Sequence, residues 1–358
     1  MKLRHALLLA LTFTASHTLT GQTRQSALVG AKNLMITTNK GTTYYYLVTS
    51  LQSPVMHLED GTVGIGTDEF QRKDIKAMRF RSLKRAVLNE DSTSFDKTLT
   101  LDHSLLALRR HLNTDKWNSL VLPFDLTGRE LLDVFGDETQ LATPRAISED
   151  GQTTVEFATM DLQTDDVVLR ANFHYLIKPS REPDVEEGKR LTNFGSSQLY
   201  GPIYLIPNVT MKANQAPRFQ TLQNEDGSTK VRLRGTYLRL DDSVVNGKII
   251  KNRRAAPGAY LLDDGLMTQH TDSAIVSAFQ SWIEDISENA QPLHFYVDGV
   301  NEDITAISSD VSPLLYSQKQ MPQTGIFNLQ GQRLHALPTA GTGKGHIYIV
   351  NGKKMVVK

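Results

Sequence analysis

Cysteine is absent from the 358-residue sequence. The sequence therefore holds no disulfide bond, no thiolate-ligated zinc, no cysteine nucleophile and no cysteine that could be acylated in a lipoprotein. A chain of this length does not depend on disulfides, because it can bury one or two complete hydrophobic cores. We expect packing and hydrogen bonding to stabilise the fold.

An excess of either charge is also lacking. The sequence contains 39 basic and 39 acidic residues, so its net charge is zero. The two signs are interspersed along the chain, which argues against nucleic acid or an anionic membrane as a partner. The composition indicates an ordinary solvated surface.

Long apolar runs are missing after the first residues. Two basic residues near the start are followed by a mostly apolar stretch at 6–13 and then by small and hydroxyl-bearing residues. This three-part pattern predicts a secretory signal peptide over residues 1–22, cleaved between Ser16 and Gln22. The apolar stretch is too short for a transmembrane helix, which needs about 20 apolar residues. We expect an exported protein at the cell surface or outside the cell, with the periplasm as the alternative.

Motifs that mark enzymes are missing too. The histidines do not form the zincin pattern of two histidines four residues apart beside a glutamate, and no Gly-x-Ser-x-Gly elbow occurs. The glycine-rich residues 61–66 lie between predicted strands, and no helix follows them, so we interpret them as hairpin geometry. We predict no catalytic, cofactor-binding or metal-binding residues.

Three pairs of neighbouring acids leave one alternative open. They lie at positions 165–166, 241–242 and 263–264. Adjacent residues on a strand point to opposite faces, so no pair forms a glycosidase dyad by itself. Carboxylates from different strands could still meet about 5–10 Å apart in a groove. The alternative is therefore a secreted, glycan-acting hydrolase whose carboxylates converge only in the folded protein.

The sequence predicts a mainly β fold with few short helices. Short apolar runs at 34–37, 44–49, 55–58 and 63–65, separated by glycine-containing turns, predict a small N-terminal β module over residues 24–81. The polar residues 82–104 are expected to form a linker. Leu105, Leu108 and Leu112 share one helical face, which favours a helix over 105–112.

A central β-sandwich region is predicted for residues 105–290. Strands are expected at intervals of roughly ten residues, the spacing typical of a sandwich: 117–124, 155–157, 167–169, 175–177, 203–206, 231–233 and 236–240. The order Thr127, Gly128, Arg129 and Glu130 predicts a short helix that ends at Phe135, before Gly136.

The C-terminal residues 291–358 are predicted to form a further β domain or tail. The dipeptide at 351–352 is Asn-Gly, the strongest short signal for a two-residue hairpin loop. Such a loop places Tyr348 opposite Met355 and Ile347 opposite Val356.

Two stretches of this tail carry a family resemblance. Residues 325–334 read Gly-Ile-Phe-Asn-Leu-Gln-Gly-Gln-Arg-Leu, and residues 345–358 read Gly-His-Ile-Tyr-Ile-Val-Asn-Gly-Lys-Lys-Met-Val-Val-Lys. They resemble the C-terminal tails of secreted Bacteroidetes proteins, especially those of Prevotella and Porphyromonas relatives. The resemblance implies an immunoglobulin-like sorting domain, with the type IX secretion machinery as a partner. Residues 117–124 and 135–136 resemble a recurrent segment of the same proteins, which implies no defined activity.

Three serines match an acceptor pattern known from the same group. Ser92, Ser243 and Ser273 each follow an aspartate, as in the Asp-Ser/Thr-apolar site of O-glycosylation in exported Bacteroidetes proteins. The resemblance implies that these three serines are candidate glycosylation sites.

These observations together favour an exported, non-enzymatic surface or secreted protein. Adhesion to an extracellular glycan or protein ligand, or a structural role, is the expected function. Tyr44, Tyr45 and Tyr46 could form part of a contact surface, although strand alternation favours a core position for Tyr45 or a neighbour. A subunit of a larger assembly is a further alternative.

Overall fold

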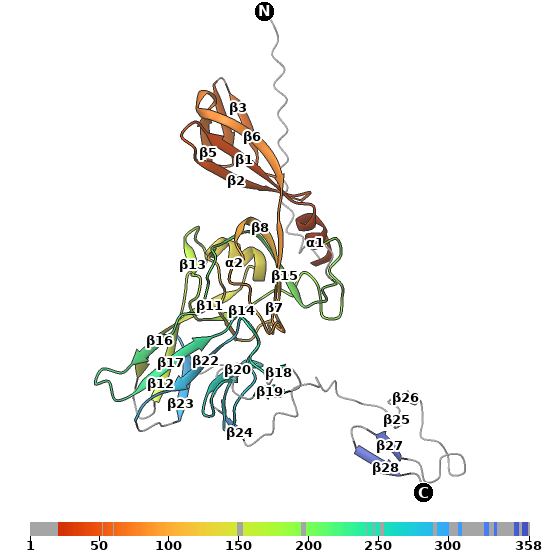
Figure 1. Ribbon diagram of the computed structural model, residues 1–358, viewed down its shortest axis with the longest axis vertical. Helices are drawn as coiled ribbons and strands as arrows, with labels where there is room; N and C mark the ends of the chain where they lie inside the picture. The colour runs from red at the N-terminus through yellow and green to blue at the C-terminus, as the bar shows by residue number, and fades with distance from the viewer. Residues whose placement is uncertain are drawn as a thin grey trace, which may run out of the picture. The chain divides into compact units, whose positions relative to one another are not determined.

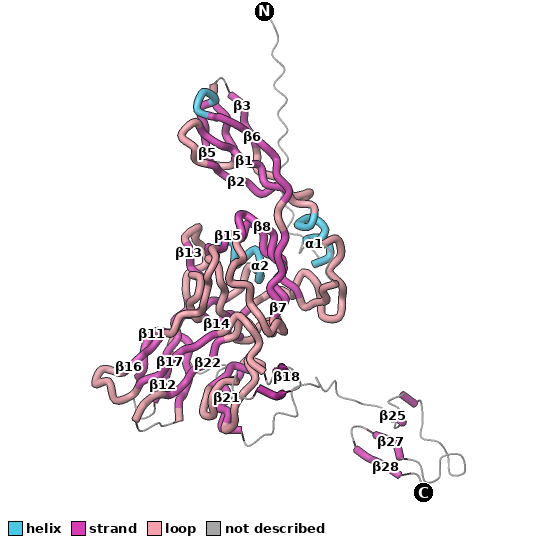
Figure 2. The backbone as a smooth tube through the Cα atoms, viewed as in Figure 1, coloured by secondary structure: helices cyan, strands magenta, loops and turns pink. Residues whose placement is uncertain are grey.

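The structure is a computed structural model. It describes residues 21–51, 53–59, 61–148, 153–194, 198–241, 243–245, 248–250, 254–288, 292–300, 307–309, 326–328, 333–334, 347–350 and 353–356. Strands account for 49% and helices for 7%, so the predicted mainly β fold class is confirmed (Figures 1 and 2). The chain divides into two units, Met1–Ser308 and Ser309–Lys358. Residues 1–20, most of the predicted signal peptide, lie outside the described residues.

Residues 32–82 form a module of two three-stranded antiparallel sheets. The four predicted strands are all present. The core between the sheets consists of Leu34, Ile36, Val63, Ile65 and Phe70. One sheet has the order β2 (Thr43–Val48), β1 (Lys32–Thr38), β6 (Ile75–Ser82), and the other has the order β3 (Met56–Glu59), β4 (Thr62–Ile65), β5 (Asp68–Gln71), with a 3-10 turn, η1, at Arg72–Asp74.

The glycine-rich residues 61–66 have the predicted hairpin geometry. Gly61 and Gly66 bracket strand β4 and have φ angles of +83° and +61°. Glycine is suited to this left-handed region because it has no Cβ.

A β-sandwich lies at the centre of the first unit, as predicted. Val155 and Phe157 of one sheet and Leu233 and Ile283 of the other contribute to one shared core. The five-stranded sheet has the order β23 (Leu293–Val297), β12 (Thr153–Thr159), β11 (Gln140–Ser148), β14 (Tyr175–Lys178), β9 (Asn118–Leu120). The six-stranded sheet has the order β16 (Gln220–Gln223), β17 (Lys230–Gly235), β22 (Ser281–Asp285), β20 (Tyr260–Asp263), β21 (Leu266–His270), β24 (Ile307–Ser309).

A third sheet is buried on both of its faces. It has the order β15 (Ile203–Met211), β8 (Leu101–Arg109), β7 (Arg85–Asn89). Leu106 and Leu108 of β8 join the largest core, which also holds helix α2 (Gly128–Phe135). Leu105 and Ala107 point to a second core, beside helix α1 (Gly21–Val29).

The prediction of a helix over 105–112 was wrong. Most of that range belongs to strand β8, which pairs in parallel with β7. A strand that is covered on both faces is apolar at successive positions, so its leucines also match the spacing of a helical face. The range predicted as a linker, 82–104, contains β7 and the first residues of β8.

Several predicted strands are shorter than expected or missing. Only 118–120 of the range 117–124 is a strand, and residues 236–240 contribute one isolated bridge, from Leu240 to Val276.

Strand β11 was not predicted. It contains Pro144, where its register with β12 shifts. The remaining short strands are β10 (Leu126–Thr127) with β13 (Val167–Leu169), and β18 (Ser243–Val245) with β19 (Lys248–Ile250).

Helix α2 begins and ends where the sequence predicted. The Thr127 side chain accepts a hydrogen bond from the Glu130 backbone N–H at 3.2 Å, and the Glu130 carboxylate accepts one from Thr127 N–H at 2.8 Å. This reciprocal pair is a capping box. Gly136 has φ +110°, and a Cβ there would lie 2.4 Å from the Ser180 hydroxyl oxygen, so both backbone and space require glycine.

The second unit contains a four-stranded sheet. Its order is β26 (Arg333–Leu334), β25 (Ile326–Asn328), β27 (Ile347–Val350), β28 (Lys353–Val356). Tyr348 pairs with Met355 and Ile347 with Val356, so the predicted register is confirmed. The Asn-Gly loop and most of the predicted immunoglobulin-like tail lie outside the described residues. Strand β23, inside the predicted domain 291–358, belongs instead to the central sheet through its pairing with β12.

Within the described part of the chain, no helix has the length and apolar character needed to cross a membrane.

Candidate functional site

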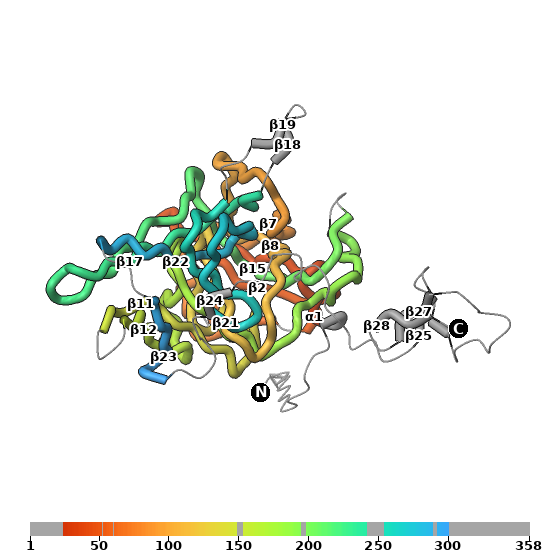
Figure 3. Tube along the Cα trace, turned by 90° about the horizontal axis from the view of Figure 1, so that it is seen from below, coloured from red at the N-terminus to blue at the C-terminus, as the bar shows by residue number. Residues whose placement is uncertain are grey.

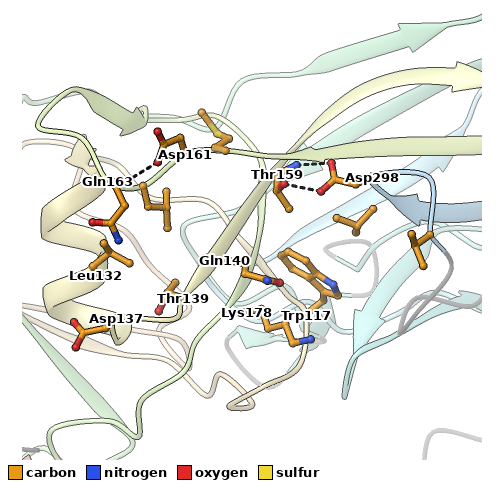
Figure 4. Close-up of a pocket in the computed structure, with 14 residues that line it drawn as sticks. Trp117, Leu132, Asp137, Thr139, Gln140, Thr159, Asp161, Gln163, Lys178 and Asp298 are labelled. Atoms are coloured by element: carbon orange, nitrogen blue, oxygen red, sulfur yellow. Dashed lines mark hydrogen bonds between the residues drawn. The ribbon is translucent and has the colours of Figure 1, made fainter.

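A cleft of about 430 Å³ lies at one end of the five-stranded sheet (Figure 4). The sheet topology creates it. Strands β12, β14 and β23 end there, whereas β11 and β9 begin there, because β11 runs antiparallel to β12 and β14. Figures 1 and 3 show β11, β12 and β23 side by side. The cleft is lined by the polar residues Asp137, Thr139, Gln140, Thr159, Asp161, Gln163, Lys178 and Asp298, and by Trp117, Leu132, Met160, Leu162, Val297 and Val300.

Asp298 is fixed to the end of strand β12. Its carboxylate accepts hydrogen bonds from Thr159 N–H at 3.0 Å and from the Thr159 hydroxyl at 2.5 Å, and its own N–H donates to Phe157 O at 2.9 Å. Its φ of +52° lies in the left-handed region, which aspartate tolerates better than most residues. These three bonds stabilise an otherwise unfavourable backbone conformation.

Trp117 gives the cleft an aromatic wall. Its side chain is only 5% exposed and packs in the sandwich core. The neighbouring Asn118 holds the preceding loop, since its amide donates to Asn113 O at 2.9 Å and to Lys116 O at 2.7 Å. In Figure 4 the indole ring lies beside Gln140 and Lys178. The ring is therefore placed rigidly at the border between the core and the cleft.

Thr139 contributes a buried hydroxyl without a partner. The residue is 6% exposed, and within the described residues Oγ1 has no hydrogen-bond partner. A buried polar group in this state costs about 1–3 kcal/mol, so nearly all such groups in proteins are satisfied by protein, water or ligand. Its oxygen is closed to solvent, so Thr139 lines the cleft without presenting a free hydroxyl to it.

The three acids of the cleft do not lie side by side. Figure 4 shows Asp137, Asp161 and Asp298 at separate places around the cleft. Asp161 accepts a hydrogen bond from Gln163 N–H at 2.9 Å, and Asp298 is bonded to Thr159. A glycosidase needs two carboxyl groups that face one another across the scissile bond. Among the described residues, no group of three or more His, Asp or Glu side chains could hold a metal ion.

The described acids among those singled out in the sequence do not line the cleft, and three of them form ion pairs. Asp165 pairs with Arg129 at 2.6 Å and Asp264 with Lys116 at 3.0 Å. Asp241 pairs with Arg239, and Asp263 lies 3.5 Å from His270. Asp242 is outside the described residues.

The three candidate glycosylation serines are not brought together. Ser92 is half-buried in a turn after β7, and its hydroxyl donates to Ser94 O at 2.7 Å. Ser243 begins β18, and Ser273 is exposed in a loop. None of the three lines the cleft.

Sequence reasoning missed the cleft. Trp117 was interpreted only as part of a predicted strand, and Thr139 and Gln140 belong to a segment with no predicted structure. The missing signal was strand β11, which brings 139–140 to the strand ends that carry Thr159 and Lys178.

Comparisons with known proteins give no match: no family model, no curated protein and no solved structure is significantly similar to this chain.

Proposed function

We propose that this protein is an exported, non-enzymatic binding protein of the cell surface, and that its cleft binds a polyhydroxylated ligand of the glycan class. The observation that carries the proposal is the pair of exposed side-chain amides, Gln140 and Gln163, in a cleft bordered by the indole ring of Trp117. Sugar hydroxyls both donate and accept hydrogen bonds, and amides and hydroxyls are groups that match them. An apolar ring beside a few fixed polar groups is also typical of small-molecule sites.

Binding fits the cleft better than hydrolysis. The Asp161 and Asp298 carboxylates are engaged by Gln163 N–H and Thr159 respectively, so both serve the local structure. Gln140 and Gln163, in contrast, are exposed at the cleft. Asp137, which is also exposed at the cleft, is then a single carboxylate, whereas a glycosidase needs two.

The binding test uses the full chain and a panel of purified soluble oligosaccharides, with titration calorimetry as the measurement. Gln140→Ala and Gln163→Ala are expected to weaken the binding of any oligosaccharide that binds the parent protein. Gln223→Ala is a matched control, since Gln223 is an exposed glutamine that does not line the cleft. Equal affinity in all variants, or no binding across the panel, contradicts the proposed ligand class.

Export to the surface rests on the N-terminal three-part pattern and on the resemblance of the tail to type IX sorting domains. We propose that the tail directs the protein to the outer surface through that machinery. The test compares the full chain with a chain truncated before Gly325, by cell fractionation and by protease access to intact cells. Surface exposure of the full chain only is the expected result, and identical behaviour of the two chains contradicts the sorting role.

A further inference from the structure

The N-terminal module is closed on one side. Tyr44 of β2 contacts Phe70 of β5 edge-to-face, with 4.9 Å between ring centroids, and the Tyr46 hydroxyl donates to the Asp68 carboxylate at 2.6 Å. Strands β2 and β5 are therefore opposite one another, and aromatic side chains cover the core between them. Since the sheet orders are β2–β1–β6 and β3–β4–β5, strands β6 and β3 lie opposite one another on the other side (Figure 1).

On that other side the core-facing side chains are uncovered. Phe80 and Met78 of β6 pair with the buried Leu34 and Ile36 of β1, and directly paired residues point to the same face of a sheet. Phe80 is nonetheless 63% exposed, and Met78 is also exposed.

Strand β3 of the second sheet also has core-facing apolar side chains that are exposed. Leu58 and Met56 pair with the buried Val63 and Ile65 of β4, so they too point toward the core. Leu58 is 73% exposed, and Met56 is exposed as well. We call Met56, Leu58, Met78 and Phe80 the β3–β6 edge. An exposed apolar edge of this kind in a β structure can accept a further strand.

The charges of β6 indicate what kind of strand could pair with it. β6 contains Lys76, Arg79 and Arg81 and no acidic residue. Arg81 bonds to Asp102 at 3.0 Å, whereas Arg79 and Lys76 are exposed and have no ion-pair partner among the described residues. Arg79 alternates with Met78 and Phe80, so it points to the opposite face of the sheet.

A second copy of this chain fits β6 poorly. Symmetric pairing of two β6 strands would bring their arginines and lysines together, and like charges opposite one another across strands are destabilising. A better partner strand has apolar residues opposite Met78 and Phe80 and an acidic residue opposite Arg79. Such a strand buries the apolar side chains and pairs with the arginine.

We propose that the β3–β6 edge binds an extended segment of another protein in which apolar and acidic residues alternate, and that this segment adds a strand to β6. The apolar side chains of the segment cover Leu58 and Phe80, and its acidic side chain pairs with Arg79. This site is separate from the cleft and does not depend on the ligand proposed for the cleft.

The test measures fluorescence anisotropy of labelled synthetic nine-residue peptides with the full chain. One peptide alternates isoleucine with glutamate and the other alternates isoleucine with lysine. We expect saturable binding of the glutamate peptide and weaker binding of the lysine peptide. Arg79 is exposed, so the Arg79→Glu variant should fold. We expect this variant to bind the lysine peptide about fivefold more tightly than the glutamate peptide, because opposite cross-strand charges contribute roughly 0.2–1 kcal/mol.

Two further comparisons separate strand addition from apolar adhesion. The glutamate peptide with N-methyl groups on all of its central amides has no N–H donor on either edge, so it cannot complete a ladder and should not bind. Phe80→Ser should weaken binding about tenfold or more, since burying a phenylalanine contributes roughly 1.5–3 kcal/mol. Phe219→Ser is the matched control, because Phe219 is 70% exposed outside the module and should be neutral.

Three results overturn the proposal. These are equal affinity for the two charged peptides with no change in Arg79→Glu, full binding of the N-methylated peptide, and equal losses in Phe80→Ser and Phe219→Ser. Concentration-dependent dimerisation that Phe80→Ser abolishes, without peptide binding, would instead assign the edge to a second copy of the chain.

Discussion

The Arg24 guanidinium donates a hydrogen bond to the Asp184 carboxylate at 2.6 Å, and the two side chains are 7% and 0% exposed. Arg24 also pairs with Asp133 at 2.9 Å and donates to Leu205 O at 3.1 Å. Asp184 accepts a second bond from Leu205 N–H at 2.7 Å. This cluster joins helix α1 to strand β15, so it attaches the first described helix to the body of the first unit.

Loss of Arg24 should destabilise the fold strongly. In Arg24→Met the Asp184 carboxylate remains buried without its main cation, and breaking a buried pair in this way costs about 3–5 kcal/mol. Urea unfolding followed by circular dichroism measures the free energy of unfolding. Arg129→Ala is the control, since Arg129 forms an exposed pair with Asp165 whose loss should cost at most about 1 kcal/mol. Similar losses in the two variants contradict the structural role of the buried pair.

The capping box of helix α2 should contribute measurably to stability. Thr127→Ala removes the side-chain acceptor of Glu130 N–H, and loss of such a cap costs about 0.5–2 kcal/mol. Thr100→Ala is the comparison, because Thr100 is exposed in a loop and substitutions at such sites usually change stability by less than about 0.5 kcal/mol. Thermal unfolding of both variants is the measurement, and indistinguishable transitions would contradict the prediction.

Two threonines that are each 6% exposed should respond oppositely to loss of the hydroxyl. The Thr236 hydroxyl donates to Leu238 O at 2.6 Å, so Thr236→Val leaves that carbonyl unsatisfied and should cost about 1–3 kcal/mol. The Thr139 hydroxyl has no partner among the described residues, so Thr139→Val should be neutral or stabilising. Chemical unfolding in the absence of sugars tests this, and a large loss in Thr139→Val would show that the hydroxyl is already bonded in the free protein.

The buried His174 should make stability depend on pH. Burial lowers the pKa of this imidazole below its usual 6.5, although the hydrogen bond from Nε2–H to Arg218 O opposes the shift. The folded state therefore binds the proton less readily than the unfolded state. The contribution to stability is present above pH 6.5 and decreases as the pH falls from there through the lowered pKa of the folded state.

Urea unfolding between pH 5 and pH 8 measures this contribution. His174→Gln should unfold with a shallower dependence on pH in this range than the parent protein. His57→Gln is the control, because His57 is exposed and should keep the parent slope. Parallel slopes for the parent and His174→Gln would show that His174 is not the group responsible.

The sequence predicted the features that depend on neighbouring residues better than those that depend on the whole fold. The start of helix α2 after Thr127 and the register of Tyr348 with Met355 depend on neighbouring residues, and both were predicted correctly. Strand β8 was mistaken for a helix because two cores cover its two faces, and only the folded chain provides both. The cleft could not be predicted, since Trp117, Thr139 and Asp298 meet only through the order of strands in the sheet.

The parallel pairing of β12 with β23 affects the order in which the chain can fold. Most of the central region separates these two strands, so Val155 and Phe157 keep an unpaired neighbouring edge until residues 293–297 arrive. Contacts that are distant in sequence form slowly, and the exposed edge is prone to aggregation until then. The five-stranded sheet therefore cannot be completed before residue 297 has been synthesised.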